Sequence, residues 1–376
     1  MRIKIFLLLL SLSFLLVSCQ NEVQETISEI PSEISDTEKE PTVTIKDLGV
    51  PFGEKYSALP EAIRPADMIV FDGNLYLGCG DYTGNRGPID MWRYSLSENE
   101  WEISGVVRDE AIHRFNVING VLMAPGIDPK DAWSMGNIYV LENDEWITKR
   151  TVTSSVHCFD LEYFDGKIFA ATHLSNGYQY VAVSHDNGET FANIPMMKNG
   201  EYVTGDNHYY DVMTIGGKLY AFCNNELYEY TENGFEYVES LFYGMQMSGL
   251  GMRAFWPIYA DEEVNGKHYF ATGNLYACTN VDDLHYVNVD QSIRIHDLYQ
   301  YNGELFALSV TNNKGEFINA VYKIVDESLE KVLEFEHDAL ALTFAVYENS
   351  FYLGMMSNDY PNPNENDGRV LQVTIE

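Results

Sequence analysis

Seven short polar turns along the chain are each followed by a segment in which large apolar or aromatic side chains alternate with other residues. The turn residues of the seven copies are Gly73, Gly120, Gly166, Gly217, Gly266, Gly303 and Asn349. Alternation with a period of two predicts β-strands. Gly and Asn tolerate the positive φ that a tight hairpin requires. The pattern therefore predicts seven β-hairpins.

These hairpins recur about 37 to 51 residues apart along the chain. Each is preceded by a mixed apolar run and followed by further strand-like segments, such as 91–95 and 100–104 after the first hairpin. Four short strands in a period of roughly 40–50 residues are typical of one blade of a β-propeller. Residues 50–376 carry no long amphipathic helical pattern, which disfavours a fold built from βαβ units.

The sequence therefore predicts an all-β, seven-bladed β-propeller, with six or eight blades as alternatives. The last hairpin is followed by only enough chain for two further strands, so the last blade would lack one strand. Residues 42–48 resemble a strand that precedes the first blade, and we expect them to supply the missing outer strand. The ring would then be closed by an N-terminal strand, which removes an exposed sheet edge.

Residues 1–18 have a basic start followed by a long apolar run, which is the pattern of a secretory signal peptide. The run ends in Leu16-Val17-Ser18-Cys19, which resembles a bacterial lipobox. This resemblance implies that Cys19 becomes a lipidated N-terminus, which would anchor the protein at the extracytoplasmic face of a bacterial cell membrane. The inner and the outer membrane are both alternatives for the site of this anchor. The alternative is an ordinary signal peptide with an incidental cysteine.

Residues 19–41 are expected to form a disordered acidic tether that begins at the lipidated cysteine. The segment is rich in Glu, Ser, Thr and Pro, a composition that buries too little apolar surface to fold. Residues 42–376 would then form the β-propeller as one domain. We expect this domain to be a monomer.

The chain is strongly acidic, with 57 Asp and Glu against 23 Lys and Arg, and a formal net charge of −34. Such a charge disfavours binding of nucleic acid or of anionic lipid by the general surface. Four cysteines follow Cys19, and none belongs to a CxxC pair. Neither a metal cluster nor a disulfide framework is therefore indicated, and no cofactor is expected.

Residues 184–191 read Ser-His-Asp-Asn-Gly-Glu-Thr-Phe. They resemble the Asp-box of sialidase-type propellers, with Phe191 in place of the usual Trp. Four positions match the motif: Ser184, Asp186, Gly188 and Thr190. The resemblance implies a structural role, because the motif caps the hairpin between the two outer strands of a blade, away from the axis.

The first repeat also resembles a kelch blade, with Trp101 in its expected outer strand and Trp146 at the same place in the second repeat. Together the two resemblances cover residues 60–376 as architecture. They imply a fold that hosts enzymes, sugar-binding proteins and protein scaffolds alike, so the fold does not give the function.

Candidate ligand-binding residues gather where the inner strands are expected to begin, beside the central channel. The pattern His, any residue, aromatic residue, then Asp or Asn occurs at 113–116, 157–160 and 208–211. We predict ligand contacts from His113, His157, Asp160, His208, Asp211 and His296. The alternative is that these groups tie adjacent inner strands together, since buried polar groups need partners. No metal site is predicted, because the ring is expected to hold the imidazoles too far apart.

Arginine is scarce in this chain, yet Arg64, Arg114, Arg253 and Arg294 all fall at or just before the expected starts of inner strands. Guanidinium groups bind carboxylates through two parallel hydrogen bonds, so these positions predict an anionic ligand at the mouth of the funnel. The alternative is that each arginine pairs with a nearby Asp or Glu. Trp256 is expected to add an aromatic platform for a sugar ring.

The favoured function is a surface-anchored lipoprotein whose propeller binds an extracellular glycan or anionic small molecule at the loop-rich face of the funnel. The first alternative is a sialidase-like, carbohydrate-active enzyme that uses the arginine funnel for a substrate carboxylate. The second alternative is a protein-interaction scaffold. Catalytic residues stay unassigned, because the sequence identifies no carboxylate pair at a set separation. Binding is favoured for that reason.

Overall fold

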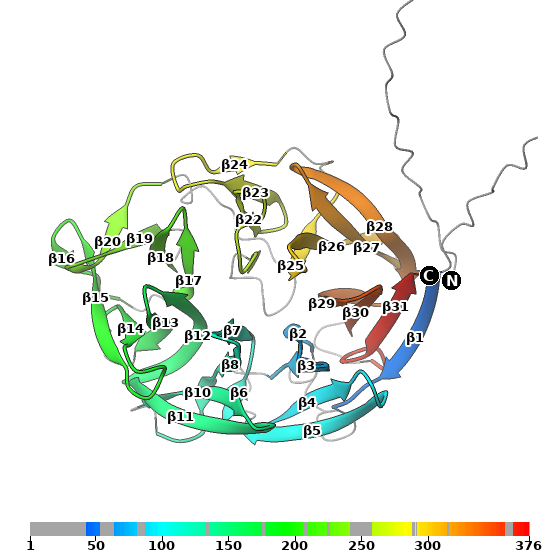
Figure 1. The fold of residues 1–376 in the computed structure, drawn as a ribbon, viewed down its shortest axis with the longest axis horizontal. Helices are drawn as coiled ribbons and strands as arrows, with labels where there is room; N and C mark the ends of the chain where they lie inside the picture. Colours follow the sequence, from blue (N-terminus) through cyan, green and yellow to red (C-terminus); the bar gives the residue numbers. More distant parts are fainter. Residues whose placement is uncertain are drawn as a thin grey trace, which may run out of the picture.

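The computed structural model describes residues 43–52, 64–80, 87–132, 135–174, 177–205, 209–223, 226–240, 258–287, 290, 292–313, 316–357 and 364–375. The regular secondary structure assigned within this part of the chain consists of β-strands, which surround a central axis (Figure 1). Within the same residues, none of the structure is a helix long and apolar enough to cross a membrane. The predicted signal peptide, Cys19 and the tether lie outside the described residues.

Strands are stacked from the axis to the rim within each blade. In the first blade the order is β2 (Asp67–Phe71), β3 (Asn74–Gly78), β4 (Ile89–Ser95) and β5 (Glu100–Val107). Three more blades follow the same order: β7 (Asn116–Ile118), β8 (Val121–Pro125), β10 (Met135–Glu142) and β11 (Glu145–Thr153); β21 (Ile258–Tyr259), β22 (His268–Ala271), β23 (Leu275–Cys278) and β24 (His285–Tyr286); β25 (Ile295–Tyr301), β26 (Glu304–Asn313), β27 (Glu316–Val325) and β28 (Ser328–His337).

Another blade combines the two ends of the described chain. It contains β29 (Leu340–Tyr347), β30 (Ser350–Met356), β31 (Val370–Ile375) and, at its outer edge, β1 (Val43–Gly49). The pairing of β1 with β31 is antiparallel, with Val43 opposite Ile375. The first and last strands therefore lie side by side within one blade (Figure 1).

The architecture is an all-β propeller, but the prediction of seven blades is wrong. Five four-stranded sheets, not seven, stand as separate blades, and the other strands form one sheet of eleven. Its members are β6 (Asp109–Ala111), β9 (Ile127–Pro129), β12 (Ser155–Phe164), β13 (Lys167–Leu174), β14 (Tyr180–Ser184), β15 (Ala192–Lys198), β16 (Glu201–Tyr202), β17 (Tyr209–Ile215), β18 (Lys218–Cys223), β19 (Glu226–Thr231) and β20 (Gly234–Val238).

Two unexpected pairings create this large sheet. At one place, Met196 and Met197 of β15 pair in parallel with Phe235 and Glu236 of β20. At the other, β12 pairs with β9, which itself pairs with β6. Both pairings join strands of different repeats. The repeat period could not predict these pairings, because it indicates which strands pair within a repeat and not which strands pair between repeats.

The hairpin turns have the backbone that the sequence pattern predicts. Between β2 and β3, Asp72 and Gly73 have φ of 45° and 72°. Positive φ at both central residues characterises a type I′ turn, whose twist matches that of the strands. A Cβ on Gly73 would meet no atom within 4 Å, so the dihedral angle and not space selects glycine there.

The hydrophobic core lies between neighbouring blades, where their faces meet around the ring. Leu75 and Leu77 of β3 belong to one buried cluster with Leu122 and Ala124 of β8. Tyr352 of β30 packs into the same cluster from the other side. Packing of this kind fixes the inner strands against one another and so gives the central cavity a fixed wall.

The residues that resemble an Asp-box close the turn between β14 and β15. The carboxylate of Asp186 accepts hydrogen bonds from the Thr190 N–H (2.9 Å), the Thr190 hydroxyl (2.6 Å) and the Ser184 hydroxyl (2.8 Å). The N–H of Gly188 donates to the Ser184 oxygen at 2.8 Å. The bonds from Thr190 and Ser184 lower the pKa of Asp186 to about 2. This turn joins outer strands and does not reach the axis.

Candidate functional site in the central cavity

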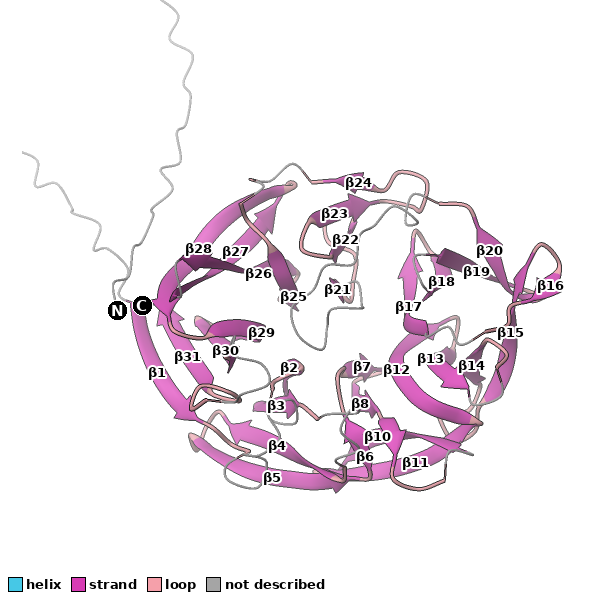
Figure 2. Ribbon diagram, turned by 180° about the vertical axis from the view of Figure 1, so that it is seen from behind, coloured by secondary structure: helices cyan, strands magenta, loops and turns pink. Residues whose placement is uncertain are grey.

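The inner strands enclose a cavity of about 520 Å³. Strands β2, β7, β12 and β25 line it together with the segment that follows β21, and Figures 1 and 2 show these elements around the axis. Its lining includes Asp67, at the start of β2, and Asn302 and Gly303 in the turn after β25. Small-molecule sites commonly have volumes of roughly 300–1,000 Å³, so this cavity is the candidate site.

Carboxylates dominate the charged groups of the cavity wall. They belong to Asp67, Glu162, Asp261, Glu262 and Asp297. Among the described residues that line the cavity, Arg114 is the one with a basic side chain. The wall therefore has an excess of negative charge, which attracts positive charge and hydrogen-bond donors.

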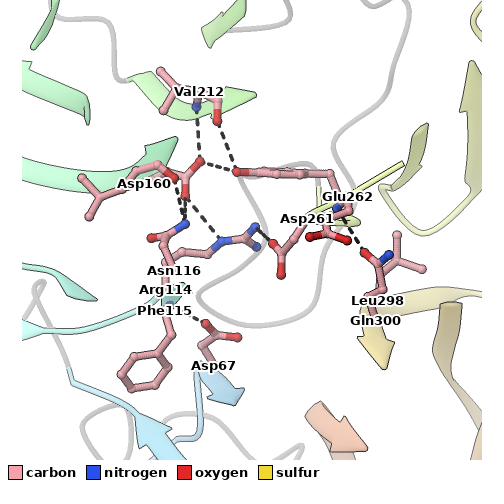
Figure 3. Close-up of polar contacts among 12 residues, drawn as sticks. Asp67, Arg114, Phe115, Asn116, Asp160, Val212, Asp261, Glu262, Leu298 and Gln300 are labelled. Carbon is pink, nitrogen blue, oxygen red and sulfur yellow. Dashed lines mark hydrogen bonds and ion pairs between the residues drawn. The ribbon is translucent and has the colours of Figure 1, made fainter. Parts of the chain in front are cut away.

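Arg114 is held by three groups at once (Figure 3). One guanidinium nitrogen donates to the Asp261 carboxylate at 2.8 Å, and its Nε lies 3.4 Å from Asp160 Oδ1. The guanidinium carbon also lies 4.4 Å from the centre of the Tyr259 ring, a cation–π contact. Burial opposes the charged form, but Tyr259, Asp261 and Asp160 outweigh it and raise the pKa of Arg114 well above its usual value. This positive charge is therefore already compensated within the protein.

Asp160 joins four inner strands through its fully buried carboxylate. It accepts a hydrogen bond from the Asn116 side chain of β7 at 2.9 Å and one from the Val212 N–H of β17 at 3.3 Å. It also accepts a hydrogen bond from the hydroxyl of Tyr259 on β21, and Figure 3 shows the polar contacts around Asp160. Removal of Asp160 would take an acceptor from these donors and one of its two carboxylate partners from Arg114.

The contacts of Asp160 recur elsewhere around the ring. Asp67 accepts the Phe115 N–H at 2.7 Å, and Asp297 accepts the Phe344 N–H at 3.1 Å. In each case the donor belongs to the first residues of the next repeat. A register shift precedes both Asp160 and Asp297 in their strands. These carboxylates therefore connect adjacent inner strands, which was the alternative interpretation of the sequence pattern.

Glu162 is a wall carboxylate with a strongly raised pKa. Burial raises its pKa to about 8, against the opposing effect of a 2.7 Å hydrogen bond from the Thr214 hydroxyl. The negative charge of Asp160 acts in the same direction as burial. Near neutral pH the Glu162 carboxyl therefore holds a proton that a nearby positive charge would displace.

Of the predicted site residues that the structure describes, it brings together two, Arg114 and Asp160. Arg64 is buried, with its Nε 3.8 Å from Asp367, and Arg294 donates to Asn274 at 3.1 Å. Neither of these arginines lines the cavity. Arg253 lies outside the described residues.

His113, His157, His296 and Asp211 are not among the residues that line the cavity. His113 and Asp211 are buried. His157 stacks on His173 at 5.3 Å and places Nδ1 3.5 Å from Asp128. His296 has Nε2 3.3 Å from the Val310 carbonyl oxygen. His208 and Trp256 lie outside the described residues.

In the described part of the chain, the cysteines and the possible metal ligands form neither a disulfide nor a metal site. Cys79, Cys158, Cys223 and Cys278 are buried free thiols. Within the described residues, no three or more His, Cys, Asp and Glu side chains are placed to hold a metal ion.

Several cavity residues were missed by the sequence reasoning. Glu162 follows Asp160 by two positions in β12, and the strand period of two was the signal that both share one face. Tyr259 and Asp261 follow a stretch with no His-x-aromatic pattern, so their position gave no comparable signal. Their role depends on contacts with Arg114 and Asp160 across the ring.

The cavity wall also presents apolar surface. Val117 and Tyr163 are 48% and 42% exposed, and both line the cavity. Tyr301 lines it as well, with its ring 6.0 Å from that of Tyr347. A ligand in this cavity would therefore meet carboxylates and the sides of aromatic rings.

Comparisons with solved structures find similar chains. A chain from the "Crystal Structure of Mitotic Checkpoint Complex" matches with a TM-score of 0.53 and 10% identity, over 96% of this chain and 99% of that one. The β-propeller domain of the Trilobed protease from Pyrococcus furiosus gives a TM-score of 0.48 and 8% identity, over 80% and 97%. PorZ of the Porphyromonas gingivalis type-IX secretion system gives 0.45 and 11%, over 77% and 35%. No protein-family model and no curated protein matches the sequence.

Proposed function

We propose that this protein is a binding module that takes a small ligand rich in hydrogen-bond donors, such as a glycan, into its central cavity. The observation that carries the proposal is a cavity of about 520 Å³ with five carboxylates in its wall and one arginine that is already paired. Ionised carboxylates only accept hydrogen bonds, so the wall suits a ligand that presents hydroxyl or amino groups.

An anionic ligand is a less favoured form of this proposal. Arg114 would have to give up Asp261 or Asp160 to bind an anion, and Arg64 and Arg294 do not line the cavity. The incoming anion would also meet the field of the five carboxylates.

We also propose that the module is a monomer anchored through a lipid on Cys19, at the extracytoplasmic face of a bacterial cell membrane. Support comes from the basic start, the apolar run and the Leu16-Val17-Ser18-Cys19 segment. Cys19→Ala should move the protein from the membrane fraction to the soluble fraction. Mass spectrometry of the wild-type N-terminus should find acyl chains on Cys19, and an unmodified cysteine would refute the anchor.

A sialidase-like enzyme finds less support than a binding module. Burial and the charge of Asp160 raise the pKa of Tyr259 well above its usual value, so its hydroxyl is a weak nucleophile unless a base takes its proton. Asp160 would have to be that base, and it is already engaged by Asn116, Val212 and Arg114. We therefore assign no catalytic role to the cavity.

A protein-interaction scaffold is the second candidate, and one feature favours it. Tyr178 and Tyr202 are 46% and 59% exposed, and Tyr202 belongs to β16, which projects from the rim of the ring (Figure 2). Exposed tyrosines are common at protein interfaces. Loss of partner binding in a Tyr178→Ala, Tyr202→Ala double variant, with ligand binding in the cavity unchanged, would support this role.

A glycan array with the purified mature protein tests the binding function. We expect neutral or amino sugars to bind, and Glu162→Gln to weaken their binding. Glu316→Gln, at an exposed position of β27 outside the cavity lining, is the matched control and should bind as the wild type does. Binding that Glu162→Gln leaves unchanged would place the ligand elsewhere.

A further inference from the structure

The charge of the cavity wall restricts the ligand more than its hydrogen bonding does. The single guanidinium of the wall, that of Arg114, pairs with Asp261 and Asp160, and Glu162 and Glu262 line the same cavity. A neutral ligand brings no positive charge to offset the excess carboxylates, which is unfavourable in a partly enclosed space. A cationic ligand would remove this cost.

The carboxylates are distributed along the wall and do not converge on one point. They come from β2, β12, β25 and the segment after β21. In the described residues no such group is arranged to hold a metal ion. A ligand with several positive charges spread along its length fits this distribution better than a single ion does.

Arg114 shows how the same wall accommodates an organic cation. Its guanidinium lies over the Tyr259 ring at 4.4 Å and is flanked by carboxylates of Asp160 and Asp261. One organic cation of the protein itself thus already combines ion pairs with an aromatic face in this cavity.

Apolar surface is available for the rest of such a ligand. Val117, Tyr163 and Tyr301 line the same cavity and offer contacts for methylene groups. Sugar rings would use the tyrosines too, but they bring no charge to offset the carboxylates. Size, charge and apolar surface together favour a flexible chain that carries amino groups.

We infer that the ligand of the central cavity is an aliphatic diamine or polyamine, bound through ammonium groups to Glu162, Asp261 and Glu262. This inference deepens the proposed binding function and rests on it. Ion pairs with the carboxylates fix the ammonium groups, and the tyrosine rings pack against the methylene segments. Binding weakens as salt concentration rises, because ions screen the carboxylates.

The acidity of Glu162 gives the binding a pH dependence. Its pKa of about 8 reflects burial, the charges of Asp160 and Asp261, and the opposing effects of Thr214 and Arg114. An ammonium group binds the ionised carboxylate, so binding is accompanied by loss of the Glu162 proton near pH 7. Spermidine affinity should therefore increase from pH 6.5 to pH 8.5, a range in which aliphatic amines stay charged.

Isothermal titration calorimetry with spermidine tests the inference on the purified mature protein. Each of Glu162→Gln and Glu262→Gln should weaken binding by roughly tenfold, because each removes one charge-assisted hydrogen bond. Glu316→Gln should not change it. Circular dichroism of each variant shows whether the fold is kept, and Glu162→Gln retains an oxygen for the Thr214 hydroxyl.

Three ligands of matched size separate the possible outcomes: spermidine, a neutral disaccharide and an anionic sugar acid. Preferential binding of spermidine that both cavity variants weaken supports the inference. Binding of a neutral or anionic sugar that Glu162→Gln weakens, without spermidine binding, overturns the inference and keeps the proposed function. Binding of none of the three overturns both. If the wild type, both cavity variants and Glu316→Gln all bind spermidine with the same affinity, the attraction is to the general surface, and this result also overturns the inference.

Discussion

At the scale of single residues, the role of each charged group depends on whether it is paired within the protein. Arg114 would be a ligand-binding group if it faced the cavity alone, yet Asp160 and Asp261 compensate it. The sequence predicted Arg114 and Asp160 near the axis, and the structure places both there. It could not predict that they face each other, because that contact depends on the rotation between neighbouring repeats. Glu162 was predictable from strand alternation and was missed.

Asp160→Ala should lower the free energy of unfolding by about 2–4 kcal/mol, because it removes one of the two carboxylates that pair with Arg114 and takes an acceptor from other buried donors. The variant also removes the acceptor of Asn116 and Tyr259. Urea denaturation measures the change. The matched control is Asp186→Ala in the exposed rim turn, which should cost clearly less. Equal losses in the two variants would contradict the bracing role of Asp160.

Protein stability should fall as pH rises from 6.5 to 8.5. Burial raises the pKa of Asp128 to about 7 and that of Glu162 to about 8, both above the values of the unfolded chain. The folded state therefore binds more protons than the unfolded state in this range and loses that advantage as both groups ionise. We expect a loss of roughly 1–2 kcal/mol, after a discount for the partial exposure of Asp128.

Chemical denaturation at each pH measures this dependence. Glu162→Gln cannot ionise, so its stability should change less with pH than that of the wild type. A stability that rises over the same range would mean that neither carboxyl has a raised pKa in the folded protein.

At the scale of elements, the hairpins were predictable because their turns are specified by two adjacent residues. Asp72 and Gly73 have the positive φ values that the Asp-Gly pair indicates. The bulges before Asp160 and Asp297 were not predictable in the same way. Here each bulge precedes a carboxylate that accepts a hydrogen bond from the next inner strand, and the local sequence does not indicate which residue of that strand donates.

Gly73→Val should destabilise the protein by about 1–2 kcal/mol, because a β-branched residue is strained at positive φ. No atom lies within 4 Å of the added Cβ, so a clash would not explain the loss. Gly73→Asn has similar bulk but tolerates this dihedral, and it should cost much less. Thermal unfolding distinguishes the two. Equal losses would indicate that side-chain bulk and not φ is responsible.

Strand β1 should protect the edge of β31. Removal of residues 1–49 exposes the backbone groups of β31, from Val370 to Ile375, that now pair with β1. We expect a lower melting temperature and aggregation in size-exclusion chromatography. Removal of residues 1–41 alone keeps β1 and is the control. An unchanged monomer after the longer deletion would show that β31 needs no such protection.

At the scale of the whole molecule, the repeat predicted a ring of β-strands correctly but its division into blades wrongly. Five blades stand alone, and the parallel pairing of β15 with β20 and the contacts of β9 merge the remaining strands. The cavity is likewise a property of the whole ring. Its acidic wall combines residues from distant repeats, such as Glu162 and Asp261, so no single motif could announce it.

The central claim is that the axial cavity is the binding site and that its carboxylates select a cationic, donor-rich ligand. A crystal structure of the mature protein grown with spermidine tests this claim most directly. We predict a ligand in the cavity with ammonium groups at hydrogen-bond distance from Glu162 or Glu262, and methylene groups against Tyr163. A cavity that stays empty at saturating spermidine, with the ligand on the outer surface alone, would contradict the claim.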